Sequence, residues 1–204
     1  MSDTVTREAD VARGGQGLAR VAVVVRAGAA PLVRLGVPAA GIGAVPEGLT
    51  GRLVGVAAGA VLFVTATAVT ALAHRPRYAA LAAGATRAGR YDLLQYRAVT
   101  VRNWRRGHRW WLLLAFVAAL GSAFALPVAG GLLLTGVGTG LRLKARWLGR
   151  RERALDALLW VRVDWLDRRG GAPAGKAVRE LRTTGVGAGD AAPGGARRRA
   201  TASV

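Results

Sequence analysis

Arginines interleaved with tryptophans are the side chains of this chain best suited to a chemical task, and that task is binding phosphate. One cluster precedes a long uncharged run and comprises Arg102, Trp104, Arg105, Arg106, Arg109, Trp110 and Trp111. A second follows the run and comprises Arg142, Lys144, Arg146, Trp147, Arg150 and Arg151. Guanidinium groups pair with phosphate oxygens, and indole rings favour the headgroup layer of a bilayer. The pattern predicts contact with anionic lipid at the inner leaflet.

The same clusters leave a second ligand open. Arginine and tryptophan together also suit phosphate contact and base stacking in a nucleic acid. A basic triplet near the C-terminus would extend that footprint through Arg197, Arg198 and Arg199. Membrane anchoring explains the tryptophans without nucleic acid, so we take anionic lipid as the first interpretation.

No arrangement of residues typical of catalysis or of metal binding is found in the sequence. Cysteine is absent, and the two histidines, His74 and His108, stand beside arginines without an acidic neighbour. The segment from Gly170 to Lys176 superficially matches a phosphate-binding loop, but Ala177 stands where the hydroxyl that holds magnesium is required. We therefore predict no catalytic, cofactor-binding or metal-binding residue, no cofactor, and a protein that is not an enzyme.

Charge and hydrophobicity are segregated along the chain, which indicates a membrane protein. The 204 residues are 52% hydrophobic, yet the formal net charge is +19. Residues 110–141 form a run of 32 without a charge, and a straight helix of that length would rise about 48 Å, well beyond a hydrocarbon core of about 30 Å. Pro127, Gly130 and Gly131 predict a break, so we expect two helices folded as a hairpin.

The remaining segments are assigned from composition. Residues 1–52 are interrupted by arginines and prolines and are predicted to be a loose or interfacial segment. Residues 53–73, an uncharged run of 21, are predicted to be the first transmembrane helix. Residues 74–109 are a basic cytoplasmic connection, residues 110–141 the transmembrane hairpin, residues 142–182 a basic amphipathic helical region, and residues 183–204 a disordered tail.

The distribution of basic residues predicts the orientation. Residues 75–109 hold nine basic residues and one acidic, and the residues after 141 hold fifteen and six. Basic segments that flank spans are retained in the cytoplasm. Three spans place both segments there, so we expect a multi-pass protein of the cell membrane with the N-terminus outside and the C-terminus cytoplasmic.

Protein partners are expected on two surfaces. The amphipathic region predicts a partner-binding face formed by Leu148, Leu155, Leu159 and Trp160. Small residues four apart, such as Gly55 with Gly59 and Gly136 with Gly140, suit close helix packing, and we favour packing within one monomer over a homo-oligomer. No ionisable residue lies within a predicted span, which argues against ion-coupled transport.

These observations predict an all-α integral membrane protein with about three transmembrane helices, one helix plus a helical hairpin, followed by a basic amphipathic cytoplasmic helix. In span pattern, arginine content and basic tail, the chain resembles the plasmid-spread proteins of actinobacterial conjugative elements. That resemblance implies a scaffold or accessory subunit of an envelope or DNA-transfer assembly, and it carries over no functional residue. The alternatives are a self-associating, holin-like pore and a membrane-anchored nucleic-acid-binding protein.

Overall fold

The computed structural model describes residues 17–89, 92–167, 173, 175 and 178–198. The chain divides into two compact units. One, the sheet unit, combines Met1–Val24, His74–Thr100 and Leu148–Val204; the other, the helical unit, combines Val25–Ala73 and Val101–Trp147. We describe each unit by itself.

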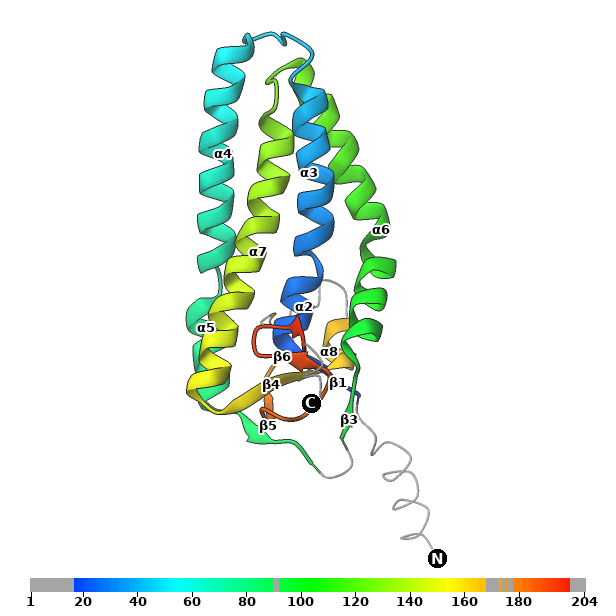
Figure 1. The fold of residues 1–204 in the computed structure, drawn as a ribbon, viewed down its shortest axis with the longest axis vertical. Helices are drawn as coiled ribbons and strands as arrows, with labels where there is room; N and C mark the ends of the chain where they lie inside the picture. The colour runs from blue at the N-terminus through cyan, green and yellow to red at the C-terminus, as the bar shows by residue number, and fades with distance from the viewer. Residues whose placement is uncertain (1–16, 90–91, 168–172, 174, 176–177, 199–204) are drawn as a thin grey trace, which may run out of the picture. The chain divides into compact units, whose positions relative to one another are not determined.

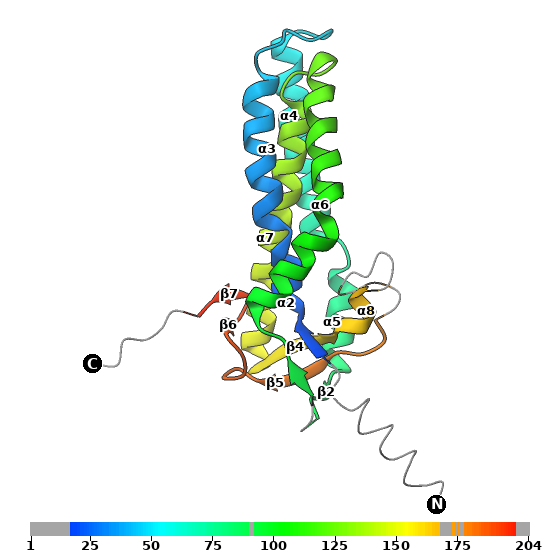
Figure 2. The same cartoon turned by 90° about the vertical axis from the view of Figure 1, so that its right-hand side faces the viewer.

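The helical unit is built from α3 (Ala29–Gly43), α4 (Arg52–Leu72) and most of α6 (Arg97–Gly121) and α7 (Ala129–Ala154). These helices run side by side in both views (Figures 1 and 2). The short α2 (Val21–Ala27) leads into α3, and a 3-10 turn, η1 (Ser122–Phe124), follows α6. The predicted break in the long uncharged run is confirmed, since Pro127 is buried and Val128 has a φ of 68° immediately before α7.

The sheet unit contains a five-stranded mixed sheet in the order β2-β5-β4-β1-β3. Its strands are β1 (Gly17–Arg20), β2 (Thr86–Arg87), β3 (Leu93–Leu94), β4 (Ala157–Arg162) and β5 (Arg182–Gly185). The pairs β1–β3 and β2–β5 are parallel, and the pairs β1–β4 and β4–β5 are antiparallel. A second sheet pairs β6 (Ala191–Ala192) with β7 (Ala196–Arg197). The unit also holds α5 (Arg75–Ala83) and α8 (Val163–Asp167).

The core of the sheet unit lies around the central strand β4. Leu18, Leu158 and Trp160 are buried together, and Leu94 and Val186 pack against them. The indole Nε1 of Trp160 donates to Oγ1 of Thr184 at 2.8 Å, which satisfies its one polar atom. All of Leu158–Val161 is buried, as expected for a strand covered on both faces.

The predicted all-α fold is wrong. Of the residues that the structure describes, 64% are helical, but the two sheets make the fold α/β. The amphipathic helix predicted for residues 142–182 ends at Ala154, because Asp156 adopts a left-handed φ of 46° and the chain continues as β4. In the tail predicted to be disordered, the described residues include β5, β6 and β7. Residues 17–43, predicted to be loose or interfacial, form β1, α2 and α3.

The three-span prediction is corrected as well. Two helical segments of the described residues are long and apolar enough to cross a membrane, Val21–Gly43 and Arg52–Ala83. The second contains the predicted span 53–73. The two arms of the hairpin are not among them, although both are helical, because arginines of the flanks continue within α6 and α7.

Candidate functional site

The helical unit has small residues inside and large apolar residues outside. Buried positions of its helices include Gly36 and Ala39 of α3, and Gly59 and Ala66 of α4. Large apolar side chains are exposed instead, among them Leu53, Val54, Val56, Val61, Val64, Val69, Leu72, Leu113, Leu114, Val117 and Phe124. A protein in water rarely exposes so many large apolar residues together, whereas small residues at helix contacts are typical of bundles in lipid.

Helix α4 shows this inversion most clearly. Only 11% of the residues in the most apolar stretch of 18 residues within Arg52–Ala83 are buried. The buried ones face α7 and the turn before it. A Cβ added at Gly55 would lie 2.7 Å from the carbonyl oxygen of Pro127 in that turn, and one added at Gly136 of α7 would lie 2.6 Å from the carbonyl oxygen of Phe63. The glycines of the pairs 55/59 and 136/140 thus lie against other segments of the same chain, and a homo-oligomer stays a prediction.

The arginines predicted to contact phosphate on α6 form one exposed stripe. Arg102, Arg105, Arg106 and Arg109 are all exposed, and their spacing of three and four residues places them on one face of the helix. Trp110 and Trp111 follow, with exposed fractions of 64% and 72%. The guanidinium carbon of Arg109 lies 5.5 Å from the ring centroid of Trp110, within the range of a cation–π contact.

Trp104 is oriented differently from its basic neighbours. A Cβ added at Gly28 would lie 2.8 Å from the Trp104 ring, so this ring packs inside the helical unit. His108 stacks on it with 4.3 Å between ring centroids and an interplanar angle of 6°. The His108 Nδ1 also lies 2.9 Å from the Trp104 carbonyl oxygen. Trp104 therefore joins α6 to α3.

The second basic cluster is divided by the fold. Arg142 and Arg146 are exposed on the part of α7 that belongs to the helical unit, whereas Lys144 is buried and Trp147 is partly buried. Lys144 is therefore not on the predicted lipid-facing surface. Arg150 and Arg151 are exposed in the sheet unit.

The C-terminal arginines are partly placed. Arg197 and Arg198 are exposed, and Arg198 donates to the carbonyl oxygens of Val186 at 2.7 Å and Gly187 at 3.3 Å. Arg199 lies outside the described residues. Arg198 is thus bound to its own unit rather than extended from it.

The predicted partner face is wrong. Leu148, Leu159 and Trp160 are each 1% exposed and belong to the interior of the sheet unit. Only Leu155 is substantially exposed, at 44%. The error follows from reading β4 as helix, because positions with helical spacing lie on both faces of a strand.

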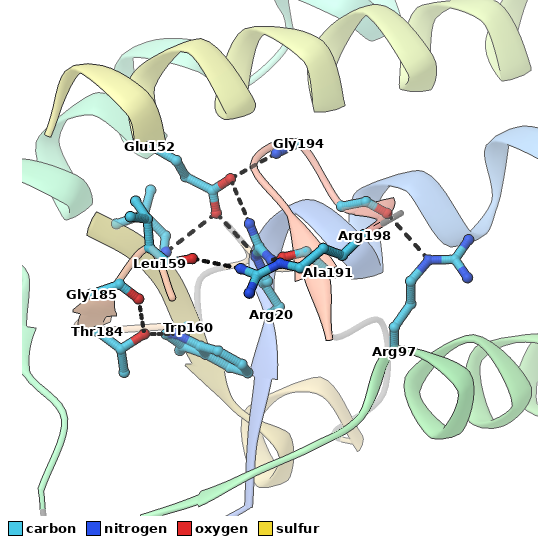
Figure 3. A network of polar contacts seen from close by, with 12 residues as sticks. Arg20, Arg97, Glu152, Leu159, Trp160, Thr184, Gly185, Ala191, Gly194 and Arg198 are labelled. Atoms are coloured by element: carbon cyan, nitrogen blue, oxygen red, sulfur yellow. Dashed lines mark hydrogen bonds and ion pairs between the residues drawn. The ribbon is translucent and has the colours of Figure 1, made fainter. Parts of the chain in front are cut away.

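A buried ion pair that sequence reasoning missed organises the sheet unit (Figure 3). Arg20 lies at the end of β1, and its Nη2 is 3.2 Å from Oε2 of Glu152 on α7; the side chains are 3% and 0% exposed. The Glu152 carboxylate also accepts the backbone N–H of Leu159 at 3.3 Å and of Gly194 at 2.8 Å. Arg20 Nη1 donates to the carbonyl oxygen of Ala191. One carboxylate thereby joins α7, β1, β4 and the β6–β7 hairpin.

The signal for this pair was present in the sequence. Arg20 interrupts an apolar segment, and Glu152 stands alone within a run of arginines. Each residue by itself reads as an exposed charge, and only the sheet pairing brings them together.

Other titratable groups suggest no reaction centre. Burial raises the pKa of the Tyr78 hydroxyl well above its usual range, so it stays protonated at neutral pH. Among the residues that the structure describes, no group of three or more His, Asp or Glu side chains is placed to hold a metal ion.

Comparison of the chain with models of protein families, with curated proteins and with solved structures finds no match. The resemblance to plasmid-spread proteins stays a prediction. The function of the chain must therefore be inferred from the two units themselves.

Proposed function

We propose that the chain is an integral membrane protein whose helical unit is embedded in the bilayer, with α3 and α4 as its crossing helices, and whose sheet unit is held at the cytoplasmic surface as a non-enzymatic scaffold. The observation that carries the proposal is the inverted helical unit, with glycine and alanine inside and large apolar residues exposed. Such a surface is stable in hydrocarbon and unfavourable in water.

The strand pairing supports an even number of crossings. β1 pairs with both β3 and β4, so residues 17–20, 93–94 and 157–162 share one sheet. A single sheet lies on one side of a membrane, because unpaired strand edges are not tolerated in hydrocarbon. The segment between β1 and β3 must therefore cross an even number of times, which pairs α3 with α4.

The charge distribution supports a cytoplasmic sheet unit. The helical unit has one acidic residue, Glu47, in the loop between α3 and α4. Apart from Arg52, the basic residues of this unit lie in the parts of α2, α3, α6 and α7 that are nearer along the chain to the sheet unit: Arg26, Arg34, Arg102, Arg105, Arg106, Arg109, Arg142, Lys144 and Arg146. Basic flanks are retained in the cytoplasm, so this proposal places the N-terminus inside, unlike the three-span expectation.

The scaffold role rests on how the sheet unit is assembled. Its three chain segments are tied by the sheet and by the Arg20–Glu152 pair into one compact body. Anchoring such a body at the inner leaflet suits the docking of another protein or of nucleic acid, and both partners stay predictions. We do not propose a pore through one monomer, because glycines inside the helical unit lie close to backbone atoms of neighbouring helices; a self-associating pore stays a prediction.

Cysteine labelling tests the topology, since the chain has no native cysteine. Ala44→Cys and Ala125→Cys report on the two loops at one end of the helical unit, and Thr86→Cys and Ala154→Cys report on the sheet unit; all four positions are exposed. A membrane-impermeant maleimide added to intact cells should label the first two and spare the others until the cells are permeabilised. Labelling of Thr86→Cys in intact cells would overturn the proposed orientation, and extraction of the protein by carbonate would overturn its insertion.

A further inference from the structure

The helical unit has an apolar band. The boundary of this band near the end of α4 can be located on α4 and on α7. The uncharged run on α4 and its C-cap, 53–73, contains 21 residues, which corresponds to about 31 Å and fits a hydrocarbon core. Near its end, Thr70 and Ala71 contact Gly140 of α7. Arg142 follows directly on α7, so both helices become polar at the level of Gly140 and Leu141.

On α3 and α6, charged residues lie past this boundary, inside the apolar band. Gly28, Trp104 and Leu141 meet at one place in the unit, which puts the start of α3 and residue 104 of α6 at the boundary. Arg34 stands six residues beyond Gly28, and Arg109 five beyond Trp104, toward the far end of the bundle. At 1.5 Å per residue these arginines lie about 9 Å and about 7.5 Å inside the band. Both side chains are exposed.

No acidic side chain of the helical unit lies at this level. Its single carboxylate, Glu47, belongs to the loop after α3, at the far end. A charged side chain at membrane depth is costly unless it reaches polar groups or draws headgroups and water inward. The countercharge for Arg34 and Arg109 must therefore come from outside the unit.

The tryptophans on α6 independently mark the same depth. Trp110 and Trp111 directly follow Arg109 and are the most exposed tryptophans at this level, at 64% and 72%. Exposed tryptophans of membrane proteins concentrate at the headgroup interface rather than in the hydrocarbon centre. On this face, the headgroup layer is thus expected to meet α6 near residues 109–111, deeper than it meets α4.

We propose that Arg34 and Arg109 bind the phosphates of anionic phospholipids, which are drawn into the bilayer along α3 and α6 so that the membrane is thinner there than beside α4. Arg105 and Arg106 extend the phosphate-binding surface toward the cytoplasm. The inference rests on the proposed membrane insertion and adds a lipid class and a position to it. The ligand is the lipid itself, because the site adjoins the exposed apolar side chains Leu113 and Val117, which contact acyl chains.

Tryptophan quenching by brominated lipid tests the proposal. The full chain is reconstituted into phosphatidylcholine vesicles that contain a small fraction of phosphatidylglycerol, with the bromine on one lipid or the other. Brominated phosphatidylglycerol should quench the wild type more than its mole fraction predicts. Arg34→Gln together with Arg109→Gln should lower the relative affinity for phosphatidylglycerol roughly thirtyfold, which is about 1 kcal/mol for each arginine.

The matched control changes charge equally elsewhere. Arg87→Gln together with Arg179→Gln removes two exposed arginines of the sheet unit, and the preference for phosphatidylglycerol should persist. The lipid site would be overturned if the Arg34/Arg109 variant kept the wild-type preference for phosphatidylglycerol. It would also be overturned if the control variant lost that preference to the same extent as the Arg34/Arg109 variant. If the protein does not insert at all, brominated phosphatidylcholine will not quench either, which separates failure of the proposed function from failure of this inference.

Discussion

Removing the carboxylate of Glu152 should destabilise the sheet unit far more than removing an exposed one. The side chains of Arg20 and Glu152 are 3% and 0% exposed. Glu152→Ala therefore leaves a buried guanidinium without its counterion. It also leaves the N–H groups of Leu159 and Gly194 without their acceptor. Breaking a buried pair by removing one partner costs about 3–5 kcal/mol, whereas an exposed pair contributes about 0–1 kcal/mol.

The absence of native cysteine provides the assay. Val161→Cys places a thiol on β4 at a position that is 0% exposed, so its labelling rate reports how often the sheet unit opens. In the detergent-solubilised full chain, Glu152→Ala should accelerate labelling at least about a hundredfold, from 1.4 kcal/mol per factor of ten. Glu180→Ala, which breaks the more exposed pair with Arg182 at 2.9 Å, is the control and should change the rate less than about fivefold.

A third variant separates charge from packing. Arg20→Met together with Glu152→Leu removes both charges and retains apolar volume, and such replacements are often neutral. This variant should label more slowly than Glu152→Ala. An acceleration below tenfold for Glu152→Ala would refute the view that this pair holds α7 and the strands together.

Two further predictions concern packing and ionisation. Gly131→Ala should destabilise the helical unit by about 1–3 kcal/mol, because its Cβ would meet backbone atoms of Ala40 and Gly36, whereas Gly107→Ala, with no atom within 4 Å, should not lower stability; thermal aggregation in detergent measures both, and equal midpoints would contradict the close packing. Since burial raises the pKa of Tyr78, the folded protein holds this proton above pH about 10 while the unfolded chain loses it, so the stability of the sheet unit should fall as pH rises from there. Tyr78→Phe should reduce that fall, and an ultraviolet titration in which native and denatured wild type ionise equally would contradict it.

The helices of the hairpin could be predicted because their signals are local. An uncharged run and Pro127 predicted a break that α6 and α7 confirm. Helix α3 was missed because the arginines and prolines of this segment argue against a spanning helix. Pro38 nevertheless lies inside α3, which is compatible with the proposed membrane insertion, because neighbouring helices can compensate for proline there.

The sheet could not be predicted from local patterns. β2 and β3 have two residues each, too few to show an alternation. β4 is a continuous apolar run with positions that also satisfy helical spacing, and the left-handed Asp156 that separates it from α7 has no distinctive sequence signal. Its partners β1 and β5 lie elsewhere in the chain, so pairing alone identifies it as a strand.

The candidate site was anticipated in part. The exposed arginines of α6 were named from the sequence, and their contact with lipid stays a prediction. Lys144 was misplaced because it lies on the face of α7 that also contains the buried Gly140 and Leu148, at the four-residue spacing of a helix. Arg34 was not predicted as a site residue, because the sequence did not show that its helix, α3, belongs to the helical unit.

The separation of β1 from its partners along the chain has a consequence for biogenesis. Arg20 and Glu152 are 132 positions apart, and ribosomes add about 5–20 residues each second. β1 must therefore wait roughly ten seconds until α7 and β4 have been synthesised and can complete its sheet. During that interval its backbone is an open edge that could pair with other chains. Chaperone capture of nascent chains arrested before residue 150, and its loss once β4 has been synthesised, would reveal this waiting period.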